Sequence, residues 1–416
     1  MKRLGWLVLA FVVGTLGACE TLDKALNTAD RALAVANSPT ARTLTNIANS
    51  KDREAAVRAG LRGRGEVYKQ DPRVLISDIR TIKRDYQNLM SFLGVKVGKT
   101  WGAAEVKLPT RTHFIKYTQN YMSRAIVDFD TGEITVETVD DKDPKTSVKN
   151  AIVTTLLTPN DPRAVDLFSD SAVTLTSERE PYLYGLVADQ NGKPIGVPGE
   201  AESFADYLIA SKSGTREVDV AGGRKTALFV QFAMVQNFEN KQADKYRDAV
   251  ARAAQKYQVS PTLVYAVIRT ESNFNPFAVS SAPAYGMMQL VPSSGGREAY
   301  RRVTGKDEAP TREYLFNAEN NIELGTAYLG ELTYSHLEPI GNATSREYCV
   351  ISAYNTGPGN VLRTFSTDRV AAVNAINRLQ PPAVYERLRS GLPYAETREY
   401  LVKVVNYRKE FISQSN

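Results

Sequence analysis

The sequence predicts the α+β fold class, with an α+β region followed by an entirely helical region. Between Trp101 and about Gln236, short β-branched and aromatic stretches alternate with helical patterns, whereas from about residue 239 onward apolar residues recur only at helical spacing. The chain has 416 residues, which is more than a single hydrophobic core usually holds. We therefore expect two folded domains, with a boundary near residues 237–243.

The N-terminus has the features of an export signal that ends in a lipid attachment site. Two basic residues precede the apolar run Leu4–Leu16, which is too short for a stable transmembrane helix. The run is followed by Gly17-Ala18-Cys19, and the whole stretch resembles the bacterial lipobox. This resemblance implies that residues 1–18 are a lipoprotein signal peptide and that Cys19 carries lipid. An ordinary signal peptide followed by an unrelated cysteine is the alternative.

The next residue predicts which membrane holds the lipid. In bacterial lipoproteins, a residue other than Asp after the lipidated cysteine implies transfer to the outer membrane, and Glu20 occupies that position. Several acyl chains anchor a protein stably, because each buried CH₂ contributes about 0.8 kcal/mol. We therefore expect an outer-membrane lipoprotein that faces the periplasm.

Cysteine content and charge agree with export. If Cys19 carries lipid, Cys349 has no partner, and its apolar neighbours in the sequence predict a buried, unreactive thiol. The formal net charge of +6 suits an acidic polymer as a partner. Nucleic acid is not expected, because the chain is predicted to be exported and has no long basic run or nucleic-acid-binding motif.

Residues 19–70 are polar and rich in alanine, which is typical of a flexible or partly helical tether. A helix is expected over 72–95, where apolar residues recur at spacings of three and four. The residues that carry this pattern are Leu75, Ile79, Ile82, Tyr86, Leu89 and Leu93.

An α+β domain is expected over residues 71–238. Two β-branched stretches, Ala125–Phe129 and Glu133–Glu137, flank the turn Asp130-Thr131-Gly132 and predict a β-hairpin. No catalytic constellation stands out in this domain, and its acidic pairs are interpreted as solvated loop charges. Further elements are expected at three places: a strand over Thr226–Met234 and helices over 146–158 and 202–211.

The domain over residues 239–416 is expected to be all-helical. Apolar residues from Tyr246 to Tyr257 form one helical face, and no strand-like alternation competes with it. Later helices are expected over 317–335, 344–355 and 394–411.

One predicted helix carries an acidic residue on its apolar face. Ser260 is a suitable N-cap and Pro261 a suitable first helical residue. Glu271 follows Val267 by four residues and Ile268 by three, so it lies with the buried stripe near the helix C-terminus. Desolvation and the helix dipole both penalise a carboxylate there, so we expect a raised pKa and a candidate general acid. A structural glutamate paired with an arginine is the alternative.

A series of short motifs follows in the sequence. They are Glu271-Ser272, Gly286-Met287-Met288-Gln289, Asn321 with Gly325, Ala353-Tyr354-Asn355-Thr356-Gly357 and Glu396-Thr397-Arg398-Glu399-Tyr400. Their order closely resembles the soluble lytic transglycosylase-like family, which has a lysozyme-like helical fold. Ordered motifs over about 130 residues make this resemblance specific, whereas any one motif alone would be weak.

The α+β region resembles the N-terminal domain of the membrane-bound lytic murein transglycosylase C family, so the likeness covers most of the chain after the tether. Two positions depart from the motif pattern: Met287 stands where Leu is usual, which conserves volume, and Tyr285 stands where a smaller or aliphatic residue is expected. The matching stretches are Val106-Lys107, Val165–Asp170, Tyr182–Gly185 and Phe204–Leu208.

The resemblance implies a lytic transglycosylase that cleaves the β-1,4 bond between N-acetylmuramic acid and N-acetylglucosamine without water and leaves a 1,6-anhydromuramoyl end. Glu271 is then the catalytic residue, first as acid and next as base, with no second carboxylate required. The resemblance also implies that Met288 and Gln289 line the groove and that Tyr354 orients the carboxyl. The full set of implied substrate-binding residues is Ser280, Gly286, Met288, Gln289, Tyr354, Asn355, Glu396 and Tyr400.

Two other functions stay open. A hydrolase of the same superfamily would use a second carboxylate; the motifs offer none in an equivalent slot, and Glu298, the nearest in sequence, lies in a polar stretch. A non-catalytic murein-binding lipoprotein is the other alternative.

No cofactor or metal is expected, because His113 and His336 are far apart in the sequence and no nucleotide-binding fingerprint occurs. The expected partners are peptidoglycan glycan strands and, through Cys19, the outer membrane. Proteins of cell-wall synthesis or remodelling are a further kind of partner that the sequence leaves open.

Overall fold

The structure is a computed structural model. It describes residues 87–414 apart from Leu89, Thr174, 176–179, 221–222 and 281–283. The signal peptide, Cys19, the tether and most of the helix expected over 72–95 lie outside the described residues. None of the described helices combines the length and the apolar character needed to span a bilayer.

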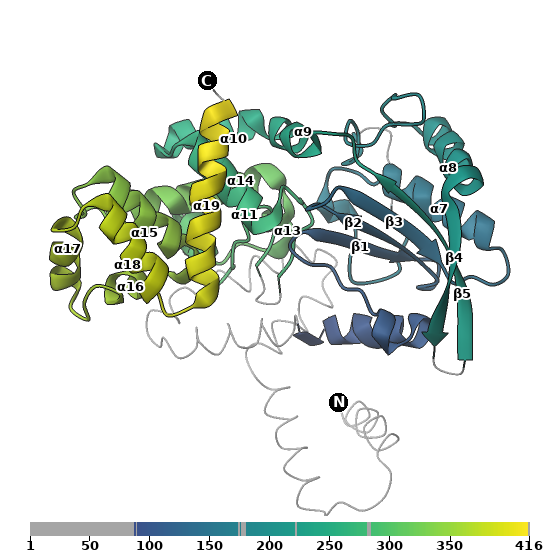
Figure 1. Cartoon of the computed structure of the whole chain (residues 1–416), viewed down its shortest axis with the longest axis horizontal. Coiled ribbons are helices and arrows are strands. Elements are labelled where there is room, and N and C mark those ends of the chain that lie inside the picture. The colour runs from purple at the N-terminus through teal and green to yellow at the C-terminus, as the bar shows by residue number, and fades with distance from the viewer. Residues whose placement is uncertain are drawn as a thin grey trace, which may run out of the picture. The chain divides into compact units, whose positions relative to one another are not determined.

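The α+β region is built on a five-stranded antiparallel sheet in the order β1-β2-β3-β5-β4 (Figure 1). The predicted hairpin is confirmed, because β2 and β3 pair around Gly132, whose φ of 73° is one that glycine adopts readily. The strand predicted over Thr226–Met234 is confirmed as β5. The strands are β1 His113–Thr118, β2 Ser123–Asp128, β3 Glu133–Thr138, β4 Ser213–Val220 and β5 Gly223–Ala233.

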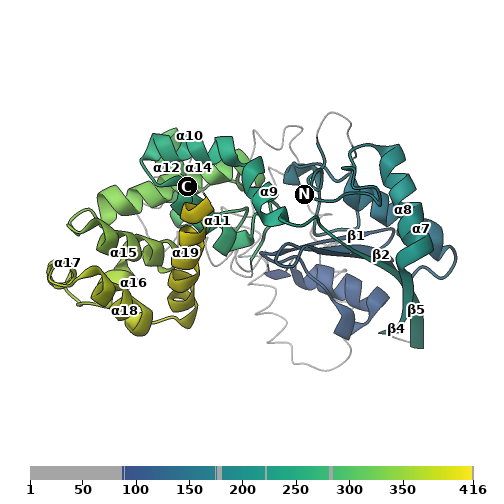
Figure 2. The ribbon, with the colours of Figure 1, turned by 45° about the horizontal axis from the view of Figure 1, so that its top comes forward.

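Helices cover both faces of this sheet. The predicted helices over 146–158 and 202–211 are present as α7 (Pro144–Leu156), which packs on β2 and β3, and α8 (Pro198–Lys212), which packs on β5. A helix over residues 90–101 lies on the opposite face in both views (Figures 1 and 2). It continues past residue 95, where the prediction ended it, because Val97 and Trp101 extend the buried stripe of Leu93. Two 3₁₀ turns, η1 Ala103–Glu105 and η2 Pro162–Ala164, complete the region.

From residue 238 onward the regular elements of the described chain are helices, as expected. The apolar face from Tyr246 to Tyr257 is buried, and the helix that bears Glu271 packs on its neighbours α10 and α19. The helices are α9 Phe238–Lys245, α10 Arg247–Tyr257, α11 Pro261–Ser272, α12 Gly295–Thr304, α13 Arg312–Phe316, α14 Ala318–Glu331, the π turn η3 Leu332–His336, α15 Ala343–Thr356, α16 Pro358–Arg363, α17 Arg369–Asn377, α18 Pro381–Gly391 and α19 Ala395–Gln414.

The loop after α11 joins the helical region to the end of the sheet. The Asn273 side chain donates a hydrogen bond to the carbonyl of Phe129 at 2.5 Å, and the Asn275 side chain donates one to the carbonyl of Arg111 at 3.0 Å. Phe277, in the same loop, is fully buried among aromatic rings of the sheet region. These contacts hold the segment that precedes β1 against the segment that follows Glu271.

Candidate active site

An open cleft of about 1950 Å³ lies where these loops meet the sheet region. Pockets for small molecules usually measure roughly 300–1,000 Å³, so this cleft suits a longer ligand. One wall comes from the helical region, and the other includes residues 108–113 and Asp130. The structure brings six of the predicted site residues together on the lining: Glu271, Ser280, Gln289, Tyr354, Asn355 and Glu396.

Glu271 lies in the last turn of α11, and only 6% of its surface is exposed. Burial raises the pKa of its carboxyl to about 7, while the nearby Tyr400 hydroxyl and the positive charge of Arg111 lower this pKa, and the negative charge of Glu396 raises it. Near neutral pH the carboxyl is therefore divided between its protonated and ionised forms. Such a group can both give and accept a proton.

The ends of α11 differ in detail from the sequence prediction. Ser260 occupies the N-cap position, but its hydroxyl lies 2.8 Å from the hydroxyl of Thr262 and makes no capping bond to a backbone amide. At the other end, α11 stops at Ser272, before the Asn275-Pro276 break, because Asn273 adopts a left-handed conformation with a φ of 45°. The earlier stop places Glu271 directly at the turn into the cleft loop.

Asn321 on α14 holds the loop that contains the Gly-Met-Met-Gln motif. It is fully buried, and its amide nitrogen donates to the carbonyls of Tyr285 at 2.9 Å and Leu315 at 2.8 Å. Its amide oxygen accepts from the backbone N–H of Met288 at 2.8 Å. Asn321 belongs to one of the sequence motifs, and the structure gives it the role of positioning this loop.

Gly286 and Met288 lie beneath the cleft lining, contrary to the expectation that they face the ligand. Gly286 has a φ of 75°, and a Cβ there would lie 2.3 Å from the Asn321 amide nitrogen, so glycine is required by packing against the protein itself. The Met288 side chain has no exposed surface and packs on Gly325, where an added Cβ would lie 2.3 Å from its sulfur. Both residues therefore support the Gly-Met-Met-Gln loop by packing against the protein interior.

Gln289 and Tyr354 face the cleft from this loop and from α15. The Gln289 amide nitrogen donates to the carbonyls of Ala278 and Gly286 at 3.1 and 2.8 Å, while its amide oxygen is buried without a hydrogen-bond partner among the described residues. The Tyr354 hydroxyl donates to the carbonyl of Met288 at 2.9 Å. Tyr354 was expected to orient the Glu271 carboxyl, but its hydrogen bond goes to the loop.

Tyr400 on α19 is the tyrosine that faces the Glu271 carboxyl. It is buried, and burial raises the pKa of its phenol well above the usual value. Its hydroxyl acts on the Glu271 carboxyl from nearby, but it makes no hydrogen bond of normal geometry in the described part of the chain. Nearby, the Thr397 hydroxyl donates to the side chain of Asn355 at 2.6 Å and ties α19 to the end of α15.

Arg111 brings a positive charge into the cleft from the sheet region. Its Nη1 lies 3.9 Å from a carboxylate oxygen of Glu271 and 3.7 Å from one of Glu396. Both distances are longer than a normal hydrogen bond. Glu396, whose side chain is mostly exposed, is thus a second carboxylate on the cleft, at most about 8 Å from Glu271.

Comparison with known proteins decides the family. Residues 70–245 match the family model for the N-terminal domain of membrane-bound lytic murein transglycosylase C, and residues 248–377 match the model for the transglycosylase SLT domain. The chain is 43% identical over 323 residues to membrane-bound lytic murein transglycosylase C of Edwardsiella ictaluri, which covers 78% of this chain and 88% of the relative. The protein of the same name from Yersinia enterocolitica is 42% identical over 326 residues, or 78% of this chain and 89% of the relative.

The chain belongs to the membrane-bound lytic murein transglycosylase C family. It is therefore a lytic transglycosylase, a lyase that acts on peptidoglycan, as the motif pattern predicted. The predicted fold class, α+β with a helical transglycosylase domain, is confirmed as well. The relatives are described as membrane-bound, which agrees with the expected association with a membrane.

Sequence reasoning missed the contribution of the sheet region to the cleft of this transglycosylase. Arg111, His113 and Asp130 all line it, although no linear motif marks them. Glu396 is among the substrate-binding residues that the motif resemblance implies, and the structure adds that its carboxylate lies on the cleft with Arg111 close to both it and Glu271. A Pro-Thr-Arg stretch ahead of a strand carries no signal that could have identified Arg111.

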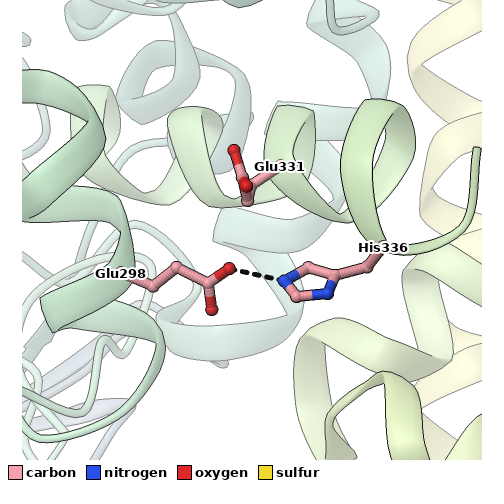
Figure 3. Close-up of side chains that lie close together, drawn as sticks. All are labelled: Glu298, Glu331 and His336. Atoms are coloured by element: carbon pink, nitrogen blue, oxygen red, sulfur yellow. Dashed lines mark hydrogen bonds and ion pairs between the residues drawn. The ribbon is translucent and has the colours of Figure 1, made fainter. Parts of the chain in front are cut away.

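The transglycosylase also holds a group that could bind a metal ion, outside the cleft lining. One ligand atom each from Glu298, Glu331 and His336 lies within 4.8 Å of the others (Figure 3). The Glu298 carboxylate is hydrogen-bonded to His336 at 2.5 Å, and Glu331 is paired with Arg302. The three side chains therefore already have protein partners, and one of the acids, Glu298, is 38 residues from His336 in the sequence.

Proposed function

We propose that Glu271 is the catalytic acid and base of this lytic transglycosylase, and that cleavage of the β-1,4 bond between N-acetylmuramic acid and N-acetylglucosamine leaves a 1,6-anhydromuramoyl end. The observation that carries this proposal is a buried carboxyl with a pKa of about 7 on a cleft large enough for a glycan strand. A carboxyl of that pKa holds its proton for part of the time near neutral pH.

In the proposed reaction, the Glu271 carboxyl gives its proton to the glycosidic oxygen, and the bond from that oxygen to C1 of the muramoyl sugar breaks. Positive charge develops at C1 and is stabilised by the sugar's own N-acetyl group. The Glu271 carboxylate then takes the proton of the C6 hydroxyl, and O6 forms a bond to C1. Glu271 is protonated again, and no water is consumed.

The neighbours of Glu271 support these two proton transfers. The nearby Tyr400 hydroxyl lowers the pKa of Glu271 and so stabilises the ionised form between the two steps. Ser280, Gln289, Tyr354, Asn355 and Glu396 are proposed to contact the sugar chain from the lining, and the buried Gln289 amide oxygen is an acceptor for a sugar hydroxyl or amide. Gly286 and Met288 support the same surface from below.

A hydrolase is the second candidate, and Glu396 is the observation that favours it. The spacing of at most about 8 Å between the two carboxylates is compatible with glycosidases that use a pair of carboxylates. The lytic transglycosylase activity of the family argues for transglycosylation.

Mass spectrometry of the released muropeptides distinguishes the two reactions. Transglycosylation gives anhydro ends, whereas products heavier by one water would contradict the proposed mechanism. A Glu396→Gln variant that still gives anhydro ends at a comparable rate would show that the second carboxylate does not supply a base.

We also propose that lipid on Cys19 anchors the enzyme to the outer membrane, after removal of residues 1–18. The lipobox-like sequence and the membrane-bound relatives support this. Residues 19–70 then serve as a tether to the two domains proposed over 71–238 and 239–416. A Cys19→Ala variant should be soluble and active, and its recovery with the membrane fraction would contradict lipidation at Cys19.

A further inference from the structure

Hydrogen bonds fix the backbone around Arg111, whereas its guanidinium is not held by any hydrogen bond among the described residues. Its backbone carbonyl accepts the hydrogen bond from Asn275, and the carbonyl of the preceding Thr110 accepts one from the backbone N–H of Val279 at 3.3 Å. The side chain, 42% exposed, lines the cleft, and among the described residues its guanidinium makes no hydrogen bond. The two carboxylates near it are 3.7 and 3.9 Å away.

Arg269, another arginine on the same cleft, shows the contrast. Its guanidinium forms ion pairs of 2.8 Å with both Glu239 and Glu410 and lies over the ring of Tyr407. Its hydrogen-bonding capacity is therefore used within the protein. Arg111 keeps its donor groups for a ligand that enters the cleft.

We propose that Arg111 binds a carboxylate of the peptidoglycan substrate and thereby makes the enzyme prefer glycan strands that carry this charge beside the bond to be cut. The guanidinium fork matches a carboxylate in geometry and charge. That carboxylate belongs either to the peptide attached to the muramoyl sugar or, in a strand stripped of peptide, to the lactyl group of the sugar. The proposal rests on the proposed cleavage at Glu271, which places the substrate next to Arg111.

Binding of this kind also affects the catalytic proton. The groups that act on Glu271 in the described chain are Tyr354 from α15, Tyr400 and Glu396 from α19, and Arg111 from the sheet region. The charge of Arg111 lowers the pKa of Glu271, and a bound substrate carboxylate neutralises that charge. The pKa of Glu271 therefore rises on binding, and the carboxyl is more fully protonated when the substrate is in place.

The first test measures binding, so that it does not depend on which residue performs catalysis. In a Glu271→Gln background, affinity for soluble glycan strands is compared for strands with intact peptides, strands stripped of peptide, and stripped strands whose lactyl carboxylate is converted to an amide. Adding Arg111→Met should weaken binding about 10- to 100-fold for a carboxylate-bearing strand and leave the amidated strand unaffected. Equal loss on all three strands, or no loss, would overturn the proposal.

The intact strand and the stripped strand identify the source of the carboxylate. A loss confined to intact strands assigns the peptide, and a loss on stripped strands assigns the lactyl group. Lys403→Met is the matched control, because Lys403 lines the same cleft and its removal also deletes one positive charge. It should affect the carboxylate-bearing and amidated strands equally, whereas Arg111→Lys should recover part of the selectivity.

The second test uses the active enzyme. On carboxylate-bearing strands, the fall in kcat at high pH should occur at higher pH than the fall in kcat/KM, because kcat reports the complex and kcat/KM the free enzyme. In Arg111→Met the two falls should coincide. If the variant does not fold, the proposal is tested by measuring kcat/KM of the unmodified enzyme on carboxylate-bearing and amidated strands. Equal values on the two kinds of strand would refute the proposal. A Glu271→Gln variant that still cleaves would refute the proposed function while leaving the binding result intact.

Discussion

The two regions of this transglycosylase each bury a glutamate, but the two carboxyl groups differ in how close the neighbouring cations lie. Glu137 in the sheet region is 3% exposed and has Arg124 at 2.7 Å and Arg216 at 2.9 Å. Glu271 in the helical region is similarly buried, but the nearest cation lies 3.9 Å away. A carboxylate with two close cations links neighbouring strands through its ion pairs. A carboxyl without one has its pKa raised by burial, and the same side chain can then exchange a proton.

The same substitution should therefore act on activity at one site and on stability at the other. Glu271→Gln removes the group that gives and takes the proton, so cleavage should fall by at least about 10²–10⁴-fold, as measured by muropeptide release from purified sacculi. A loss of less than about tenfold would contradict the role of Glu271.

Glu271→Gln should also become more stable than the parent protein as pH rises. The folded-state pKa of about 7 lies above the unfolded value near 4.5, so the ionised parent is destabilised progressively between these values and fully above the higher one. The difference in unfolding free energy should approach about 3 kcal/mol at most above pH 8 and vanish below about pH 4. Denaturant unfolding at several pH values measures it.

Glu137→Gln should destabilise the protein by about 3 kcal/mol, because Arg124 has no exposed side-chain surface and would lose one of its charge partners. Glu105, at 2.9 Å from Arg124, keeps part of the pairing. The folded fraction should retain normal turnover. Asp219→Asn is the matched control, since its ion pair with Arg224 is largely exposed and should change stability by less than about 1 kcal/mol. Similar losses of unfolding free energy in the two variants would show that the buried ion pair of Glu137 stabilises the protein no more than an exposed one.

Asn321→Ala tests whether the cleft loop depends on support from α14. The substitution deletes three hydrogen bonds, including those to the N–H of Met288 and the carbonyl of Leu315, which should cost about 1–3 kcal/mol and lower activity by displacing Gln289. Asn320, next to it, bears no such bonds to the loop, so Asn320→Ala serves as the comparison. Unchanged thermal unfolding in Asn321→Ala would show that the loop holds its shape without this residue.

The smallest effect is expected for Tyr400→Phe. The nearby Tyr400 hydroxyl lowers the pKa of Glu271, so its removal should raise that pKa and move the fall in kcat/KM at high pH further upward. Turnover should decline several-fold because the carboxylate formed after the first step is less stabilised. Tyr354→Phe should move the profile less, since that hydroxyl donates to Met288. A larger shift for Tyr354→Phe would assign the orienting role to Tyr354 after all.

Much of the fold follows from local patterns. The hairpin around Gly132, the helices α7 and α8, the strand β5 and the helix of Glu271 all obey spacings of two, three or four residues that a sequence displays directly. The strand β4 was not predicted, because most of its side chains are exposed or half-buried and its apolar alternation is weak. The helix before the sheet was ended too early, since Trp101 was read as the start of a strand-rich segment.

The features of the candidate site likewise fall into those that follow from local sequence patterns and those that depend on tertiary packing. The spacing of residues in the sequence places Glu271 on an apolar helix face, and its burial and raised pKa follow from this through desolvation. The packed structure was needed to show that Arg111 lies near both Glu271 and Glu396, that Tyr400 rather than Tyr354 faces the carboxyl, and that Gly286 and Met288 lie below the lining. Burial on one helix is a periodic property of neighbours in the chain. Contacts between segments more than a hundred residues apart depend on how loops and helices pack, and short-range spacing does not encode them.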